Sequence, residues 1–514
     1  MDIGVPGPYP PGDSQLRDGR TDVVDRVALT AFAAVLGGTS LIALSARWLR
    51  PSRELPSMDG WAVAGRDFGG FITWFLLGGS IFTAYTFAAV PGLAYGAGAL
   101  GFFALPYTIM LCPVLFLLLP RLWRIAADGG HVTVADYVRE RYNSPGLALA
   151  VALTGILATM PYIALQLLGI RAVLSASMVY PSGFGGDLIL IGVFAILAVA
   201  TFRRGLRAPT VISLFKGPLV FGAGLGVTVV VLYQLGGPGA IFERAAHPLD
   251  ARPETRLLLD PSTYTVFASL ALGSALAQPM YPHVLTAAFS ANGENTLRRA
   301  AIALPAWTVL LGLFGFLGIA ALAAGVLAPP GSAESSVPLL VARMLPSALA
   351  GAVYGALAVG ALVPAAIMSV AVATLFTRNV YVEYFFPTAT PKHELKTAQL
   401  VSLLAKAGAL AFVFGLRDQD AINLQLLGGV WILQTFPAVA IGAFFGWFHR
   451  IGVFAGWAVG MVAGTLFVVS GGFSSVVEVG WSIKLYAALV ALLLNLLVAT
   501  GVTFVLRRSS VGMP

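Results

Sequence analysis

The sequence predicts an all-α membrane protein with 13 transmembrane helices and a core of two inverted five-helix repeats. Three observations predict this fold. The chain has 514 residues, of which 58% are hydrophobic and only 11% are charged, whereas soluble domains carry about 25% charged residues. Apolar runs of about 20 residues, enough to cross a bilayer, recur along nearly the whole chain. Two of these runs are interrupted at corresponding places in the two halves of the chain.

The expected helices follow the apolar runs in order. Their approximate limits are 27–47, 69–97, 100–122, 146–178, 186–202, 208–235, 263–290, 299–327, 348–377, 397–416, 421–447, 452–471 and 480–506. Without the first helix and the last two, ten remain, and they divide into two groups of five. The predicted segments are therefore an extracellular tail (1–26), a first helix with an inner loop (27–68), core repeat 1 (69–235), an outer loop (236–262), core repeat 2 (263–447), and two C-terminal helices with a short cytoplasmic tail (448–514).

The distribution of positive charge predicts the orientation in the membrane. Lys and Arg concentrate in the cytoplasmic loops of membrane proteins. With the N-terminus outside, 19 of the 31 Lys and Arg residues fall in inner loops and 8 fall in outer segments. We therefore expect the N-terminus outside and the C-terminus in the cytoplasm. Because the basic residues are spread over short loops, the net charge of +8 does not indicate a nucleic-acid partner.

Each predicted repeat begins with an interrupted helix. Glycines, hydroxyl side chains and a proline fall within 78–92, and a similar set falls within 273–283. A helix in lipid satisfies its own backbone hydrogen bonds, so irregular backbone is tolerated only where it lines a cavity or packs against protein. A pair of interrupted spans in two halves of a chain indicates the substrate site of a secondary transporter.

Signatures of an enzyme are absent from the sequence. We find no metal-ligand spacing and no phosphate-binding loop, and the glycine-rich runs lie inside predicted helices rather than after a strand. A single cysteine, Cys112, excludes an internal disulfide framework. We therefore expect a protein that is not an enzyme, with no cofactor and no certain metal site.

Four strings, in order along the chain, resemble the sodium:solute symporter family. They are the run 71–92, Gly130–Val138 with Arg141-Tyr142, Gly205–Ala208 and Leu375–Tyr381. Further strings, among them Tyr281–His283 and Leu362–Ser369, are similar to the bacterial monocarboxylate permease subgroup. The resemblance implies a LeuT-like fold with one extra N-terminal and two extra C-terminal helices. It also implies alternating access, import of lactate, pyruvate, acetate or propionate with a cation gradient, and the plasma (inner) membrane of a bacterium.

The chain departs from the family pattern at the cation site. The resemblance places the backbone carbonyls of a sodium site on Gly79, Phe82 and Gly360. The two hydroxyl side chains expected on the eighth core helix are replaced by Val363 and Pro364. Because a hard cation needs oxygen ligands, the resemblance implies a sodium site that has lost two of its side-chain ligands.

Lys216 brings a positive charge toward the same site. It stands ~12 Å into the fifth core helix, where the resemblance implies a glutamine, and an unpaired ammonium at that depth costs roughly 2.5–3.5 kcal/mol or more. We hypothesise that its amine donates to the carbonyls of Gly79 and Phe82 in place of sodium, and that its uptake and release of a proton replaces sodium coupling. The alternative is a side chain that reaches the inner membrane surface, with sodium as the coupling ion.

Polar side chains predict the lining of the substrate site. The N-terminus of a half-helix offers N–H groups and a partial positive charge to a carboxylate. The expected lining residues are Thr83, Thr86, Tyr162, Gln166, Ser274, Gln278 and Gln434; the alternative role for each is a contact between helices. No Asp or Glu lies deep in a predicted helix, which disfavours a cationic substrate. For His283 we expect a hydrogen bond between helices.

Three functions are compatible with these observations. The first is a transporter that imports small monocarboxylates with protons or sodium. The second is a sodium symporter for an amino acid or a vitamin, such as proline or pantothenate. The third is a transport-derived membrane sensor, for which the residues Ser509–Pro514 are expected to be too few to form a signalling domain. We expect a small organic acid and the lipid bilayer as partners, and a monomer or a weak homo-oligomer.

Overall fold

The computed structural model describes residues 25–49, 57–177, 185–186, 188–192, 195, 205–250, 256–415, 421–480 and 483–511. Helices dominate these residues. They are α1 (Arg26–Leu49), α2 (Met58–Ala62), α3 (Gly70–Ile81), α4 (Val90–Ala97), α5 (Ala104–Asp128), α6 (Val134–Tyr142), α7 (Pro145–Ala176), α9 (Arg207–Gln234), α10 (Gly237–Asp250), α11 (Tyr264–Ala277), α12 (Pro282–Phe289), α13 (Glu294–Ala303), α14 (Pro305–Ala323), α15 (Ser336–Met344), α16 (Ser347–Phe376), α17 (Pro391–Gly415), α18 (Ala421–Ile432), α19 (Gly442–Phe444), α20 (Arg450–Ser470) and α21 (Ala487–Val511). The predicted tail 1–26 and the predicted helix 186–202 lie largely outside the described residues.

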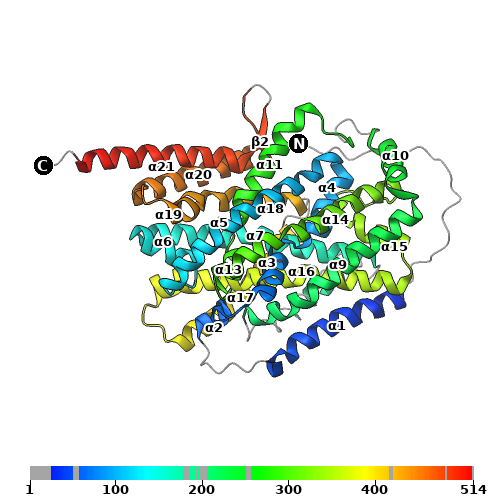
Figure 1. Ribbon diagram of the computed structural model, residues 1–514, viewed down its shortest axis with the longest axis horizontal. Helices are drawn as coiled ribbons and strands as arrows, with labels where there is room; N and C mark the ends of the chain where they lie inside the picture. The colour runs from blue at the N-terminus through cyan, green and yellow to red at the C-terminus, as the bar shows by residue number, and fades with distance from the viewer. Residues whose placement is uncertain are drawn as a thin grey trace.

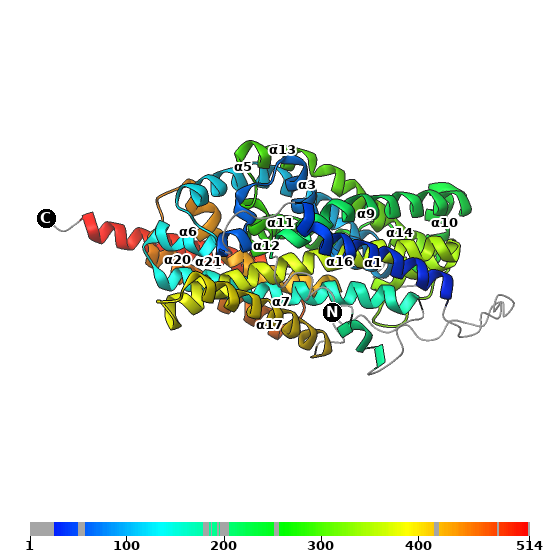
Figure 2. The same ribbon diagram turned by 90° about the horizontal axis from the view of Figure 1, so that it is seen from below.

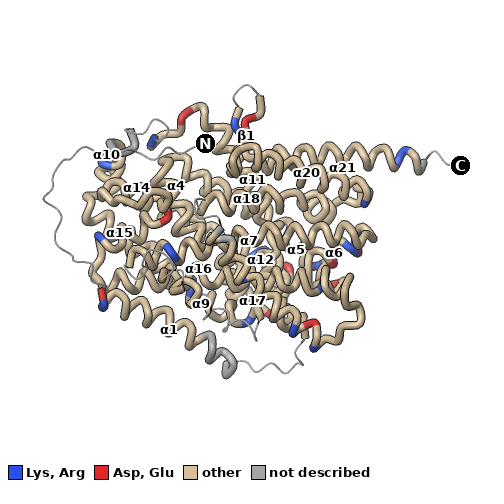
Figure 3. The backbone as a smooth tube through the Cα atoms, turned by 180° about the vertical axis from the view of Figure 1, so that it is seen from behind, with Lys and Arg blue, Asp and Glu red and all other residues tan. Residues whose placement is uncertain are grey.

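Several of these helices can cross a membrane. Within the described ranges, seven helical stretches are long and apolar enough, and two bent pairs of helices raise the number to nine. Lys, Arg, Asp and Glu lie mostly near the two ends of the bundle, and the tube between the ends carries few of them (Figure 3). The chain is therefore a mainly helical, multi-span membrane protein. The total of 13 spans and the division into two repeats stay predictions.

The first interrupted segment is broken at Phe82. The backbone of Phe82 is extended, with φ −91° and ψ 91°, so α3 ends at Ile81. The chain continues through the π-helical turn η2 (Tyr85–Ala89) into α4, and the axis bends by 49° across this break. Pro91 is accommodated at the start of α4, because the first turn of a helix needs no N–H donor from it. The interruption predicted here is confirmed.

The second interrupted segment is broken at Tyr281. The short 3-10 turn η5 (Gln278–Met280) follows α11, and Tyr281 is extended with ψ 134° before α12 begins at Pro282. A proline disfavours helical backbone in the residue before it, which explains the position of the break. This interruption is confirmed as well.

The two broken segments lie against each other at one end. The N–H of Phe68, just before α3, donates to the Ser290 carbonyl at 3.1 Å, and the N–H of Asn292 donates to the Phe68 carbonyl at 3.0 Å. These bonds join the start of α3 to the end of α12 as a short parallel bridge. The half-helices α3 and α12 also pack directly on each other.

Helix α16 runs through the middle of the bundle. It packs against α1, α7, α9 and α17, and its membrane-spanning stretch is buried throughout. In Figure 2, α7 and α17 lie on one side of α16, and α3, α5 and α13 lie on the other. In Figure 1, α1 lies at one edge of the bundle, and the paired helices α20 and α21 lie at the opposite edge.

Two predicted helices differ from the structure. The predicted helix 421–447 is bent by 41°, where α18 gives way to the turns η8 (Leu433–Thr435) and η9 (Pro437–Ile441); Pro437 lacks the N–H that would continue the helical hydrogen bonds. The predicted helix 480–506 begins only at Ala487, because the preceding residues form an antiparallel hairpin of β1 (Val476–Glu478) and β2 (Lys484–Tyr486). Valine and tyrosine favour strands, and this short β-pattern was missed in the sequence.

Candidate functional site

The break in the first segment leaves backbone carbonyls without helical partners. In a continuous helix the Gly79 carbonyl would accept from the N–H of residue 83, but α3 ends at Ile81. The last carbonyls of a helix are unsatisfied and carry a partial negative charge. The carbonyls of Gly79 and Phe82 therefore form an electronegative position inside the bundle.

Lys216 fills this position. Its side chain is only 1% exposed on α9, and its amine donates to the Gly79 carbonyl at 2.7 Å and to the Phe82 carbonyl at 3.0 Å. A Cβ placed on Gly79 would lie 3.8 Å from the Lys216 nitrogen and 3.6 Å from the Ser213 hydroxyl, so this side of the broken helix is closely occupied. Lys216 does not reach the membrane surface, and its amine contacts the two carbonyls named above. Its role in coupling stays a prediction.

Gly360 does not join this contact. Among the described residues, the hydrogen bonds of the Lys216 amine go to Gly79 and Phe82 only. Gly360 lies on α16 beside the Phe87 ring and Val220, where an added Cβ would be 2.9 Å from the ring. The resemblance placed Gly360 at this site because a metal ion there would bridge α3 and α16. The Lys216 amine comes from a third helix, α9, and bonds only to carbonyls at the end of α3 among the described residues.

Gln166 connects α7 to the first break. Its side-chain oxygen accepts from the N–H of Ala84 at 2.9 Å. Its side-chain nitrogen donates to the Thr83 hydroxyl at 3.2 Å and to the Tyr162 carbonyl at 3.1 Å. The carboxamide thus replaces helical hydrogen bonds that the break removes, which holds Thr83 and Gln166 together in a buried position.

Gln278 lies at the second break, where Tyr107 of α5 contacts it. The Tyr107 hydroxyl donates to the Gln278 side-chain oxygen at 3.0 Å. Tyr162 of α7 packs edge to face against Tyr281 at the second break, with ring centroids 5.1 Å apart, so α7 contacts both breaks. Tyr85 and Tyr107 pack edge to face, with ring centroids 6.1 Å apart. These two tyrosines were missed by sequence reasoning, although a phenol inside an apolar run is itself a signal.

Four buried polar atoms of this cluster have no hydrogen-bond partner within the described residues. They are the hydroxyl oxygens of Tyr85, Thr86 and Ser274 and the side-chain nitrogen of Gln278. A buried polar group without a partner costs about 1–3 kcal/mol, so such groups usually serve a ligand or water. All four can donate a hydrogen bond, and none is charged. The arrangement is suited to an acceptor-rich, small ligand.

Two further sequence-based expectations differ from the structure. Gln434 does not lie with the other candidates: its nitrogen donates to the Ala488 carbonyl of α21 at 3.3 Å, and Asn495 of α21 donates to its oxygen at 3.3 Å. His283 is fully buried beside the Tyr162 and Tyr281 rings, at centroid distances of 5.3 and 5.4 Å. Among the residues that the structure describes, neither ring nitrogen of His283 has a hydrogen-bond partner, so the expected interhelical bond is not seen there.

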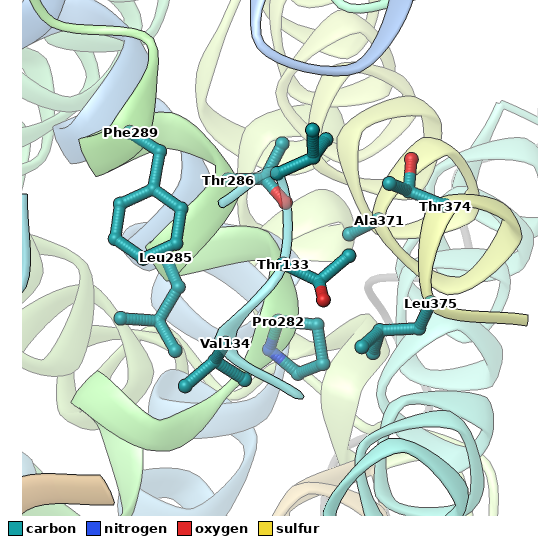
Figure 4. A pocket seen from close by; sticks show the side chains of 10 residues that line it. Thr133, Val134, Pro282, Leu285, Thr286, Phe289, Ala371, Thr374 and Leu375 are labelled. Carbon is teal, nitrogen blue, oxygen red and sulfur yellow. The ribbon is translucent and has the colours of Figure 1, made fainter. Parts of the chain in front are cut away.

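A small pocket lies beside the second half-helix. It is lined by α12, by α16 and by the residues just before α6, and its space of about 10 Å³ holds roughly one water molecule. Figure 4 shows Thr133, Thr286 and Thr374 around it together with apolar side chains.

Nearby, the Arg66 guanidinium donates to the carbonyls of Phe289, Ala126 and His131 at 3.3, 3.1 and 2.5 Å. Arg66 thus ties the end of α12 to α5 and to the residues just before α6.

Removing the Tyr107 hydroxyl tests the polar cluster. We expect Tyr107→Phe to raise the KM for substrate about fivefold, because the Gln278 oxygen loses its donor and the carboxamide loses its fixed orientation. Thr108→Val is the matched control, since among the described residues the Thr108 hydroxyl bonds only to carbonyls of its own helix. Initial rates of uptake over a range of substrate concentrations would measure both. An unchanged KM in Tyr107→Phe would contradict the assignment.

Comparisons with known proteins agree with this architecture. The family model of the sodium:solute symporter family matches residues 61–460. The "Monocarboxylate transport permease protein" of Rhizobium johnstonii is 44% identical over 466 residues, which cover 90% of this chain and 93% of that protein. The "Uncharacterized symporter YodF" of Bacillus subtilis is 32% identical, over 80% of this chain and 82% of its own length.

Solved structures show the fold alone. A Na+-coupled sialic acid symporter, in a substrate-bound outward-open state, has a TM-score of 0.75 with 14% identity, and the match covers 93% of this chain and 98% of that one. Mhp1, a nucleobase-cation-symport-1 family transporter in a closed conformation, has a TM-score of 0.52 with 16% identity, over 88% of this chain and 97% of that one. The chain therefore has a LeuT-like transporter fold.

Proposed function

This chain belongs to the sodium:solute symporter family of membrane transporters, and from that premise we propose that it imports small monocarboxylates with protons as the coupling ion. Lactate, pyruvate, acetate and propionate are the substrates proposed. The import works by alternating access about the two broken segments. The protein lies in the inner membrane of a bacterium, with its N-terminus outside and its C-terminus in the cytoplasm, which the bias of basic residues toward one set of loops supports.

The observation that carries proton coupling is the contact of Lys216. Its amine donates to the carbonyls of Gly79 and Phe82, and in the described chain no carboxylate forms an ion pair with it. Val363 and Pro364, buried on α16, offer no side-chain oxygen to a metal ion. When the amine is charged, its hydrogen bonds join α9 firmly to the broken segment; when it is neutral, the same hydrogen bonds are weaker. Proton uptake and release at this nitrogen would therefore change how firmly the two parts are held together.

The chemistry of the polar cluster supports a monocarboxylate. Tyr85, Thr86, Ser274 and Gln278 offer donors without a partner, and a carboxylate is an acceptor with four lone-pair sites. Tyr85 packs on Tyr107, and Tyr162 packs on Tyr281, so aromatic surface lies at both breaks, which suits a short carbon chain. A similar protein of 44% identity carries the name monocarboxylate transport permease, which supports the same substrate class.

Imposed gradients would test the proposal on the unmodified protein. In proteoliposomes, we expect an inward proton gradient without sodium to drive accumulation of labelled pyruvate. A sodium gradient at equal pH on both sides is expected to drive none. Protonophore should abolish the accumulation. Sodium-driven uptake at symmetric pH would overturn proton coupling while leaving the substrate assignment in place.

The choice of substrate and controls matters in this experiment. Pyruvate is preferred to acetate because it is the stronger acid, so less of it crosses the bilayer unaided as the neutral acid. Empty liposomes under the same pH gradient measure that passive share. Unlabelled acetate, lactate and propionate should compete with pyruvate, and proline or pantothenate should not. Competition by proline or pantothenate alone would favour the amino-acid or vitamin symporter.

A further inference from the structure

Arg171 faces Glu334 across the end of the bundle that the charge bias predicts to be outer. Arg171 lies on α7, and Glu334 lies in the short turn η6 (Ala333–Ser335). The guanidinium nitrogen and the carboxylate oxygen are 3.6 Å apart, with 21% of the Arg171 side chain and 6% of the Glu334 side chain exposed. At this distance the two groups form an ion pair, but the distance is longer than that of a normal hydrogen bond. The pair is therefore close without the bidentate geometry that arginine and carboxylate can reach.

The position of Arg171 relates it to the substrate site. Gln166, which contacts Thr83 and Ala84 at the first break, precedes Arg171 by five residues on the same helix, hence by ~7.5 Å along its axis. Tyr162 lies one turn further in on that helix. Arg171 therefore lies nearer the predicted outer end than the polar cluster does, and its side chain leaves α7 about 140° around the axis from that of Gln166. It can meet an external substrate before the substrate reaches the cluster, without lining the cluster itself.

The segment that carries Glu334 covers the outer half of the first broken helix. Its backbone passes so close to Gly92 of α4 that a Cβ on Gly92 would lie 2.9 Å from the Glu334 nitrogen. Further back, the Tyr95 hydroxyl donates to the Val326 carbonyl at 2.9 Å and accepts from the Ala328 N–H at 3.2 Å. The segment 326–335 is therefore held against α4 by these contacts, and the Glu334 carboxylate that it carries lies beside the Arg171 guanidinium.

The chemistry of the pair matches that of the substrate. Resting on the proposed function, we propose that Arg171 is a capture site for the carboxylate of the external substrate, and that the Glu334 carboxylate occupies this site when the outer side is closed. The guanidinium fork binds a carboxylate in two parallel hydrogen bonds, which the 3.6 Å contact with Glu334 does not supply. When the segment 326–335 moves off α4, the substrate carboxylate takes the place of Glu334. Substrate and closing segment therefore compete for one guanidinium.

A double-mutant comparison separates this capture role from a structural one. Arg171→Gln, Glu334→Gln and the double variant are reconstituted, and the KM for external pyruvate is measured. We expect Arg171→Gln to raise the KM at least about tenfold, and Glu334→Gln to lower it because the internal competitor is lost. The double variant should keep the high KM of Arg171→Gln. Recovery of the wild-type KM in the double variant would overturn the proposal, since Arg171 would then serve only to neutralise Glu334.

Controls keep the result interpretable. Arg343→Gln removes a different basic residue near the same end, one that donates to the Gly325 carbonyl, and it should leave the KM unchanged. If Arg171→Gln fails to fold, Glu334→Gln alone decides: an unchanged or higher KM overturns the proposal. Absence of pyruvate uptake by the wild-type protein would instead refute the proposed function, so the two failures are distinguishable.

Discussion

Replacing Lys216 by glutamine is expected to abolish accumulation of pyruvate driven by a pH gradient. Glutamine can still donate to the carbonyls of Gly79 and Phe82, which accept from the lysine amine at 2.7 and 3.0 Å, but it cannot gain or lose the proton. Two hydrogen bonds from a charged donor are worth about 1.5–3 kcal/mol each, so we expect the driven rate to fall at least ~100-fold. Uptake into proteoliposomes with an imposed pH gradient measures this loss.

Exchange of labelled for unlabelled pyruvate distinguishes lost coupling from a lost fold. Exchange needs the alternating movement but no net proton transfer, so the Lys216→Gln variant should retain it. Lys406→Gln is the matched control: Lys406 is the other fully buried lysine among the described residues, and its amine donates to the Ser402 carbonyl and hydroxyl of its own helix, at 3.2 and 2.8 Å. Within the described ranges its amine makes no hydrogen bond to either break, and its replacement should leave pH-driven uptake intact. A Lys216→Gln variant that still accumulates pyruvate along a pH gradient would refute the coupling role.

The two breaks could be predicted because local residue chemistry decides them. Phe82 and Tyr281 are extended where glycine, hydroxyl residues and proline weaken the helix on either side. The contact of Lys216 followed from the same logic, because an amine this far inside a membrane helix needs acceptors and a broken helix supplies them. Both inferences depend on the cost of leaving a polar group without a partner in lipid, and that cost can be read from sequence.

Other parts of the site could not be predicted, since they depend on how each helix is rotated. Helices α7 and α16 are apolar on every face, so no periodic pattern tells which side faces the breaks. The same holds for the segment of α18 and η8 that carries Gln434, a weaker candidate than Gln166: its side chain faces α21. Tyr107 and the pair of Arg171 with Glu334 join segments that are far apart in sequence. Tyr107 stands out as a phenol inside an apolar run, but the local sequence names the partner in neither contact.

Replacing Gly78 by alanine is expected to destabilise the first break and to stop transport. A Cβ on Gly78 would lie 2.3 Å from the indole nitrogen of Trp307 and 2.5 Å from the next ring carbon. Trp307 of α14 is fully buried, and its ring stacks on Phe82 with centroids 5.7 Å apart. Overpacking of a dense core typically costs 1–3 kcal/mol. We expect a fall of several degrees in the Tm of the detergent-solubilised protein, together with loss of pyruvate uptake.

The loss of transport should exceed what the fall in Tm explains, because the indole holds Phe82, whose carbonyl accepts from Lys216 at 3.0 Å. Displacement of the ring by a methyl group moves this carbonyl, and a hydrogen bond weakens steeply away from its normal geometry. A second substitution, Trp307→Leu, makes room for the methyl group, so the double variant Gly78→Ala/Trp307→Leu should regain part of the lost Tm. Gly96→Ala is the matched control on α4, where nothing lies within 4 Å of an added Cβ. If Gly78→Ala keeps the wild-type Tm and uptake rate, the indole does not fix the break, and the position of the Phe82 carbonyl must be set by Lys216 and Gln166 alone.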